Sequence, residues 1–179
     1  MKGRPIRSAV LTISDRCSQG ETEDLSGPVV AEILSSWGWS PDVREILPDE
    51  EMLVAERLAT LADTGFSLVI TTGGTGLGPR DRTPEATLRV VDRQVPGLAE
   101  LLRSRTGDGF PRAYLSRGII AMRRHCLIVN LPGSTRGARE GIEALADVLP
   151  HALDVILEDP AEGSAHGPDT GRARPKGGS

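Results

Sequence analysis

The sequence predicts an α/β protein in which helices cover both faces of a mostly parallel sheet, a three-layer α/β/α sandwich. Two observations favour this class. Short apolar runs rich in Val, Ile and Leu alternate along the chain with segments whose apolar residues recur at helical spacing. The 179 residues, 38% hydrophobic and 26% charged, also suit one ordinary globular domain. Alternation of strands and helices is typical of parallel sheets, because parallel strands need crossover connections.

The first half of the chain predicts three strands separated by two helices. The β-branched run at 8–14 indicates a buried strand that stops at Asp15, and a loop follows it. The apolar pattern of 28–37 predicts a helix with Ser26 as its N-cap. The remaining elements expected here are a strand at 42–49, a helix at 50–63 and a strand at 66–72.

The second half predicts further helices and a pair of strands. Thr83 as cap and Pro84 at the first helical position indicate a helix that runs to Pro96 and resumes over 97–105. The last helix has one apolar stripe, which continues through Pro150, so a kink is expected there. The two strands are expected at 118–122 and 126–131, antiparallel to each other.

Residues 159–179 differ in composition from the rest of the chain. They contain no large aliphatic or aromatic residue, so no burial of apolar surface can offset the entropy lost on ordering them. We expect a single domain over residues 1–158 and a disordered tail over 159–179.

The composition excludes several classes of function. Two cysteines without a CxxC pair and three histidines without ligand spacing argue against zinc. A net charge of −4 disfavours general binding to nucleic acid or anionic membranes. No apolar stretch reaches the roughly 20 residues of a membrane span, and the N-terminus does not resemble a signal peptide. A cytoplasmic location is therefore expected.

Lysine is confined to Lys2 and Lys176, near the two ends. The body of the chain therefore offers no lysine for a Schiff base or for a GxxxxGK[ST] phosphate loop. A bound phosphate would have to be held by backbone N–H groups, hydroxyls, arginines or a metal ion.

Polar residues follow four of the apolar runs, at Asp15, Asp49, Gly73 and Asn130. In a parallel sheet the carboxyl ends of the strands meet at one edge, and that edge is where ligands bind. The sequence therefore predicts a site built from these four strand ends.

A glycine-rich loop dominates the third strand end. Glycine permits positive φ and a close approach of ligand to backbone, and a helix start follows the loop, which suits an anionic group. A ligand-free tight turn is the alternative. Pro79 stands where a GxGxxG fingerprint would need glycine, so no standard nucleotide motif is present. The loop is TTGGTGLGPRD, with Gly73, Gly74, Gly76 and Gly78 and the candidate ligand Thr75.

Two carboxylates accompany this loop. Asp81 lies between two arginines and Asp49 ends a different strand, so both are candidates to hold Mg²⁺ at the same edge. With a glycine loop and no lysine, this pattern favours metal-assisted phosphoryl or nucleotidyl transfer. A solvated surface turn around Asp81 is the alternative.

Two later segments add candidates for binding phosphate. Ser134 follows a strand and opens the last helix, where it could cap that helix or bind a phosphate. Arg117, after Ser116, could clamp a phosphate through two N–H groups, although a surface ion pair fits its position equally well.

The ordered set of motifs resembles one family. It comprises LTISD, D-x-SGP, ILPDE, TTGGTG-x-x-PRD-x-TPEAT, LSR and NLPGS, spread over about residues 7 to 157. In this combination the chain is similar to the molybdopterin adenylyltransferases, the MogA-type enzymes of molybdenum cofactor synthesis, and to the G domain of gephyrin.

The resemblance implies a trimer of three-layer α/β domains with the MoaB/Mog-like fold. It implies molybdopterin and Mg-ATP as substrates, transfer of AMP to the terminal phosphate of the pterin, and a molybdate-insertion protein downstream. Asp49 and Asp81 match the family's catalytic, metal-binding aspartates. The matches to its substrate contacts are Thr12, Ser14, Asp15, Gly73, Gly74, Thr75, Gly76, Ser116, Arg117, Gly133 and Ser134.

A second function fits the same resemblance. A trimer could hold molybdopterin or its adenylate for delivery or scaffolding without catalysing the transfer. The presence of both Asp49 and Asp81 favours the enzyme, because a simple carrier of an anionic pterin gains nothing from two nearby carboxylates.

Overall fold

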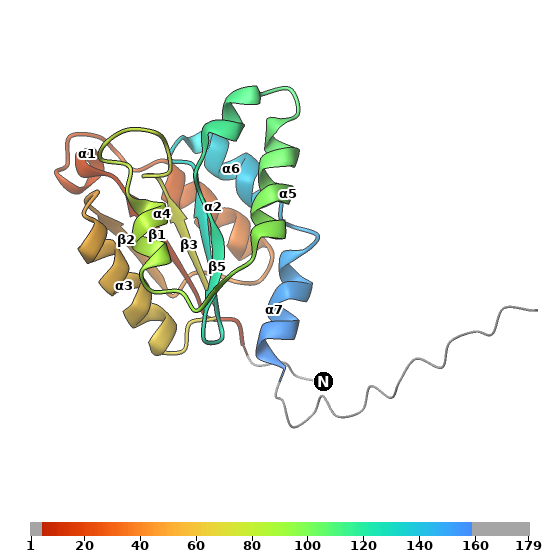
Figure 1. The fold of residues 1–179 in the computed structure, drawn as a ribbon. Helices are drawn as coiled ribbons and strands as arrows, with labels where there is room; N and C mark the ends of the chain where they lie inside the picture. The colour runs from red at the N-terminus through yellow and green to blue at the C-terminus, as the bar shows by residue number, and fades with distance from the viewer. Residues whose placement is uncertain (1–4, 159–179) are drawn as a thin grey trace, which may run out of the picture.

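The computed structural model describes residues 5–158, and the predicted tail at 159–179 lies outside them. A six-stranded sheet in the order β2-β1-β3-β6-β5-β4 forms the centre of the molecule (Figure 1). The first four of these strands are parallel neighbours, β5 runs antiparallel to β6, and β4 runs antiparallel to β5 and so in the direction of the first four. The strands are β1 Ser8–Ile13, β2 Val43–Leu47, β3 Leu68–Thr72, β4 Arg93–Gln94, β5 Ile120–Arg123 and β6 Cys126–Leu131.

Helices cover both faces of this sheet, so the predicted three-layer architecture is confirmed (Figure 1). One face packs against α3 and α4, and the other packs against α2, α5, α6 and α7. The helices are α1 Asp15–Ser18, α2 Ser26–Ser36, α3 Glu51–Asp63, α4 Thr83–Leu88, α5 Pro96–Gly107, the 3-10 helix η1 Pro111–Leu115, α6 Thr135–Glu143 and α7 Leu149–Leu157.

The strands alternate between two hydrophobic cores. Val10 of β1 joins the core under α2 and α6, whereas its neighbours Ala9 and Leu11 join the core under α3. This period of two is the pleat of a strand whose two faces are both buried. Every residue of β1, β3 and β6 is buried, which explains why these strands read as continuous apolar runs.

Several local expectations were wrong. The segment after β1 contains the short helix α1, where a loop was expected. Ser26 does not cap α2; the Asp24 carboxylate accepts the N–H of Gly27 at 2.9 Å instead. Thr83 is not a side-chain cap either, because its hydroxyl donates to the carbonyl of Gly73 at 3.0 Å. The helix that begins there ends at Leu88 rather than near Pro96.

Tertiary pairing explains the early end of α4. Arg93 and Gln94 form β4, which pairs with Met122 and Ala121 of β5 and extends the sheet by one short edge strand. The final helical stripe is also divided, into α6 and α7, with Pro150 in the first turn of α7. The helix is therefore interrupted before the proline rather than bent at it.

Within residues 5–158 no helix is both long enough and apolar enough to cross a bilayer.

Candidate active site

The four predicted strand ends do meet at one edge of the sheet. Strands β2, β1, β3 and β6 are parallel neighbours, so Leu47, Ile13, Thr72 and Leu131 end side by side. The backbone continues this contact past the strands, because Gly73 N–H donates to the Leu131 carbonyl at 3.0 Å. The loops that carry the candidate residues therefore emerge together.

The glycines of the loop allow this close packing of strand ends. Gly73 and Gly74 have φ of 96° and 62°, in the region that favours glycine. A Cβ on Gly73 would lie 2.2 Å from the Ile13 carbonyl oxygen, and one on Gly133 would lie 3.0 Å from Gly73 Cα. Any side chain at Gly73 would therefore separate β3 from β1.

Asp81 folds back over the rest of this loop. One of its carboxylate oxygens, Oδ2, accepts the N–H of Gly78 at 2.8 Å and lies against both Gly76 and Gly78. A Cβ on either glycine would come within 2.9 Å of that oxygen. Because Gly76 and Gly78 have no side chains, the loop has room for the Asp81 carboxylate.

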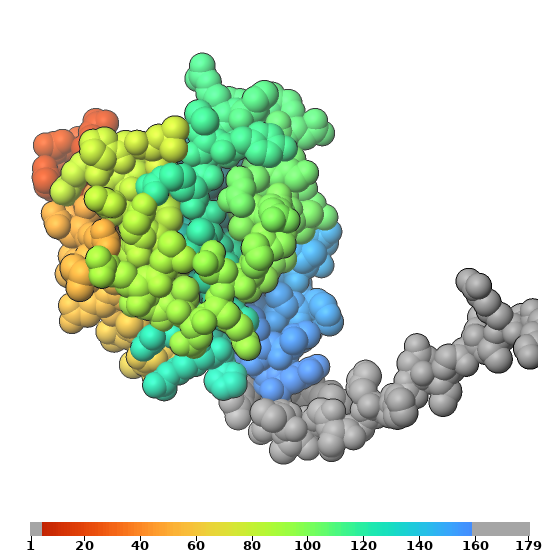
Figure 2. Space-filling view, viewed as in Figure 1, coloured from red at the N-terminus to blue at the C-terminus, as the bar shows by residue number. Residues whose placement is uncertain are grey.

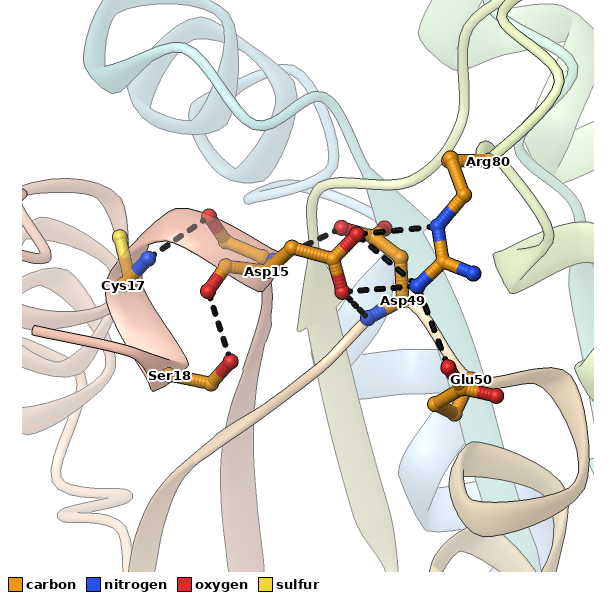
Figure 3. A network of polar contacts seen from close by, with 7 residues as sticks. Asp15, Cys17, Ser18, Asp49, Glu50 and Arg80 are labelled. Carbon is orange, nitrogen blue, oxygen red and sulfur yellow. Dashed lines mark hydrogen bonds and ion pairs between the residues drawn. The ribbon is translucent and has the colours of Figure 1, made fainter. Parts of the chain in front are cut away.

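A reciprocal pair of hydrogen bonds joins Asp15 to Asp49. Asp15 N–H donates to Asp49 Oδ2, and Asp49 N–H donates to Asp15 Oδ1, each at 2.9 Å (Figure 3). The guanidinium of Arg80 donates twice to the Asp15 carboxylate, at 3.0 Å, and also reaches Glu50 at 3.2 Å. Arg80 therefore neutralises Asp15, and this leaves Asp49 as the less compensated charge of the pair.

The surroundings of Asp49 disfavour its ionised form. Burial raises the pKa of the Asp49 carboxyl, and the charges of Asp15 and Asp81 raise it further, against the lowering effects of the Asp15 N–H and of Arg80. A cation bound between Asp49 and Asp81 would relieve this repulsion.

This environment predicts that Asp49→Asn stabilises the fold. A raised folded-state pKa means that Asp49 contributes stability below its unfolded pKa and loses it as pH rises through the folded value. The variant is therefore expected to melt above the parent at neutral pH, without added metal, and the difference should shrink on acidification.

Melting curves across pH, followed by circular dichroism, test this expectation. Asp63→Asn is the control of opposite sign, because its hydrogen bond to Arg123 lowers the pKa of the Asp63 carboxyl. A neutral-pH melting temperature of Asp49→Asn below that of the parent would contradict the account of Asp49.

Two cavities open at this edge of the sheet. The η1 cavity, about 400 Å³, lies between the glycine loop and the α5–η1 segment, which stands beside the loop at one end of the molecule (Figure 2). The α1 cavity, about 590 Å³, lies between β1, α1 and the turn before α2. Five residues line both cavities, and we call them the seam: Gly73, Gly74, Asp81, Gly133 and Ser134.

The other predicted site residues divide between the cavities. Thr75, Gly76 and Ser116 line the η1 cavity. Thr12, Ser14 and Asp49 line the α1 cavity. Two candidates line neither. The carboxylate of Asp15 is held by Asp49 and Arg80, and the guanidinium of Arg117 is directed at the backbone of the loop.

The start of α6 is oriented toward the seam. Ser134 caps this helix and accepts the N–H of Gly137 at 3.1 Å. The N–H groups that the first turn of a helix leaves unpaired therefore lie beside the seam, where they could bind an anion.

Sequence reasoning missed one wall of the η1 cavity. Its side chains come from α5, η1 and α6, which carry no recognisable motif. Arg112, two residues after Phe110, is a sequence signal for this wall, but a single arginine there does not distinguish a ligand contact from a surface charge. The missed lining residues include Thr106, Phe110, Arg112, Leu115 and Arg136.

Asp81 of the seam and Asp49 of the α1 cavity fit a hard cation that also takes ligands from a phosphate. In the described part of the chain no group of three or more His, Cys, Asp or Glu side chains is placed to hold a metal ion, so a closed protein cage is not formed. Asp49 and Asp81 each use one oxygen, Oδ2, in a hydrogen bond to the backbone. Mg²⁺ is commonly bound by one or two carboxylates, waters and substrate phosphates, which matches this donor set.

The fold and the site together define a class of protein. An α/β sandwich carries two adjacent cavities that share a wall of glycines, one aspartate and one serine, with a helix start directed at that wall. Such a site is suited to two small ligands whose anionic groups must meet.

Comparison with known proteins identifies the family. Residues 9–151 match the model described as "Probable molybdopterin binding domain", and the chain belongs to this family. It is 42% identical over 155 residues to the molybdopterin adenylyltransferase of Helicobacter pylori, covering 85% of this chain and 88% of that protein. The Escherichia coli K12 enzyme of the same name is 39% identical over 145 residues, covering 79% and 74%.

Solved structures agree with this assignment. The molybdopterin biosynthesis enzyme MoaB of Thermus thermophilus superposes with a TM-score of 0.82 at 46% identity, covering 87% of this chain and 98% of that one. The molybdopterin biosynthesis Mog protein of Mycobacterium ulcerans gives 0.80 at 40% identity, covering 84% and 99%. The predicted family and fold are confirmed.

Proposed function

We propose that this protein is a molybdopterin adenylyltransferase of molybdenum cofactor biosynthesis. It transfers AMP from Mg-ATP to the terminal phosphate of molybdopterin and releases pyrophosphate. The observation that carries the proposal is the seam, where two cavities of different character meet at a backbone surface suited to phosphate. The names of relatives that match most of the chain, at 39–42% identity, support it.

The two substrates are assigned by the character of the cavities. The η1 cavity has apolar walls from Phe110 and Leu115, with Arg112 and Ser116 beside them, and suits a flat pterin that carries a phosphate. The α1 cavity is larger and more polar and contains Asp49, so it suits the nucleotide. The pterin phosphate and the α-phosphate of ATP would then meet at the seam.

The transfer requires that the two phosphates be aligned and that their negative charge be neutralised. A pterin phosphate oxygen attacks the α-phosphorus of ATP, the new P–O bond forms, and the bond to the departing pyrophosphate breaks. The nucleophile is already an anion, so no strong general base is required. Backbone N–H groups of the glycine loop and the hydroxyls of Ser116 and Ser134 would hold the phosphates in line.

Asp49 and Asp81 would hold Mg²⁺ at this point. When bound, the ion supplies neutralisation of the charge that develops on the phosphates. The two carboxylates fix its place relative to the seam, and Arg80 keeps Asp15 from competing, because it already pairs with Asp15. The roles of the individual site residues, including Thr12, Ser14 and Asp15, are part of this proposal.

Several wider properties rest on the family resemblance. We propose that residues 1–158 form the functional domain, that it assembles as a homotrimer in the cytoplasm, and that its product passes to a molybdate-insertion protein. Exposed apolar side chains such as Met52 and Leu77, 66% and 67% accessible, are compatible with burial in a subunit interface. Light scattering at micromolar concentration tests the trimer.

Incubation with molybdopterin, ATP and Mg²⁺ tests the activity directly. Stoichiometric pyrophosphate and an adenylated pterin are expected, and both should be lost without Mg²⁺. Tight binding of molybdopterin without pyrophosphate release would instead support the binding-only function.

Cysteine alkylation reports on the assignment of the nucleotide to the α1 cavity. Cys17 lines this cavity and is half-buried, whereas Cys126 is fully buried, which raises the pKa of its thiol to about 12. Iodoacetamide is expected to label Cys17 and spare Cys126. Mg-ATP should slow the labelling of Cys17 at least severalfold, and molybdopterin should not.

Mass spectrometry of peptides from timed reactions measures both rates. Cys17→Ser, which removes the reactive thiol, identifies the labelled site. Protection of Cys17 by molybdopterin but not by ATP would reverse the assignment of the two cavities.

A further inference from the structure

Arg117 contacts the glycine loop and holds both of its ends. Its Nε donates to the carbonyl of Gly76 at 2.7 Å, and Nη2 donates to the carbonyl of Asp81. Its backbone N–H donates to the carbonyl of Thr75 at 2.8 Å. One residue from the segment before β5 therefore holds the two ends of a loop that lies 36 to 41 positions earlier in the chain.

The middle of this loop has few other contacts with the rest of the protein. Residues 77–80 are exposed, and Leu77 is 67% accessible. Within the loop, Asp81 is bonded to Gly78 through Oδ2 and through its own N–H. The side chain of Arg80 also ties the turn to the carboxylates of Asp15 and Glu50, in ion pairs that are partly exposed. Arg117 is the side chain that holds the backbone at both ends of the loop, and it lies in the segment that leads into β5.

Glu85 orients Arg117 from the first turn of α4. Its Oε1 accepts Nη1 of Arg117, and this hydrogen bond lowers the pKa of the Glu85 carboxyl, so the pair is ionised. The other oxygen, Oε2, is buried and has no hydrogen-bond partner, and it is the only side-chain N or O atom of that kind in the described residues. A buried carboxylate oxygen without a hydrogen-bond partner destabilises the folded state, so its presence suggests a role other than stabilising the fold.

We propose that Arg117, oriented by Glu85, is a positioning residue for the transfer reaction and sets the place of the Asp81 carboxylate at the seam. The inference rests on the proposed adenylyl transfer. By holding the Asp81 carbonyl, Arg117 fixes the backbone from which the carboxylate projects. All three sides of its guanidinium are engaged, so it acts through Asp81 rather than on a phosphate.

Steady-state kinetics of Arg117→Gln provide the first test. Misplacement of a reacting group by about 1 Å can cost roughly 100-fold in rate, so kcat is expected to fall about 10- to 100-fold. The KM values for molybdopterin and ATP should stay within about threefold. Arg117→Lys should not rescue kcat, because one ammonium group cannot reproduce a planar fork with three acceptors.

Arg123→Gln is the matched control. Arg123 also pairs with a carboxylate, Asp63, and donates to a backbone carbonyl, that of Val90, at 2.7 Å. It stands at the other end of β5, away from the seam, and its side chain is 24% exposed against 35% for Arg117. Its loss should lower the melting temperature as much as the loss of Arg117 but leave kcat unchanged.

A double-mutant cycle separates positioning from any independent role. If Arg117 acts through Asp81, Arg117→Gln should cause little further loss of kcat in the Asp81→Asn background. Multiplied losses would mean that Arg117 contributes by another route, such as direct contact with a phosphate, and would overturn the proposal.

Amide hydrogen exchange tests the proposal without catalysis. Backbone exchange over residues 76–82 should accelerate in Arg117→Gln and stay unchanged in Arg123→Gln. If the parent releases no pyrophosphate, the proposed function fails, and the exchange data still decide whether Arg117 orders the loop. Unchanged exchange in Arg117→Gln, or normal kcat despite faster exchange, overturns the inference.

Discussion

Asp81→Asn is expected to lower the rate of pyrophosphate release about 100-fold or more while the protein folds normally. Loss of one well-placed electrostatic contributor to a transition state typically costs this much. Asn keeps the size of Asp81 and an oxygen that can accept the N–H of Gly78, the bond now made by Oδ2 at 2.8 Å. It removes the charge that a hard cation prefers. Binding of molybdopterin should persist or tighten, because a negative charge near its phosphate is gone.

A comparison of Asp81→Asn with Asp81→Ala distinguishes two roles. If Asp81 only closes the turn, Asn should be nearly normal and Ala impaired. If Asp81 holds Mg²⁺, both should be inactive, and Asp49→Asn should behave similarly. The double variant of Asp49 and Asp81 should lose less than the product of the single losses, because both carboxylates serve one ion.

Asp147→Asn provides the control for this series. Asp147 is an exposed carboxylate that pairs with Arg105, and neither residue lines the two cavities, so its neutralisation should leave turnover unchanged. Near-normal turnover of Asp81→Asn would refute the catalytic assignment.

Gly74→Val is expected to weaken molybdopterin binding at least tenfold and to abolish most of the turnover. At φ of 62° a β-branched residue is strained. The added Cβ would lie 2.2 Å from Thr83 Oγ1 and 3.0 Å from Asp49 Oδ1. Both the support of the loop by Thr83 and the free oxygen of Asp49 would be displaced.

Gly38→Val is a control that introduces backbone strain without a steric clash of the new side chain. Gly38 has φ of 83°, and a Cβ there meets nothing within 4 Å. Both variants should therefore melt below the parent, because an unfavourable backbone region lowers the free energy of unfolding by about 1–3 kcal/mol. Only Gly74→Val should lose binding, measured by titration with molybdopterin. Parent-like affinity of Gly74→Val would show that the loop is only a turn.

The sequence predicted those parts of the site that depend on local pattern. Buried strands have a strong apolar signal, and the polar residue after each strand reveals the edge where parallel strands end. That signal predicted that the strand ends at Asp15, Asp49, Gly73 and Asn130 meet at one edge. The parallel order β2-β1-β3-β6 agrees with it.

The parts that could not be predicted depend on contacts between distant segments. The strand β4 exists because Arg93 and Gln94 pair with β5, and no local preference announces this. Helix α1 is only four residues long and has no buried residue, so it carries no apolar stripe. From the sequence Arg117 could clamp a phosphate or form a surface ion pair, and its actual partners Gly76, Asp81 and Glu85 come from another part of the chain.

The seam has a consequence for the end of the reaction. It consists of three glycines, a serine and an aspartate, so no long side chain separates the two cavities. The joined product extends across it and is a bivalent ligand. Once one half is bound, the other half is held at a millimolar effective concentration, which can raise the overall affinity about 10²- to 10⁴-fold. Product departure rather than bond formation is then expected to limit turnover, unless an acceptor removes the product.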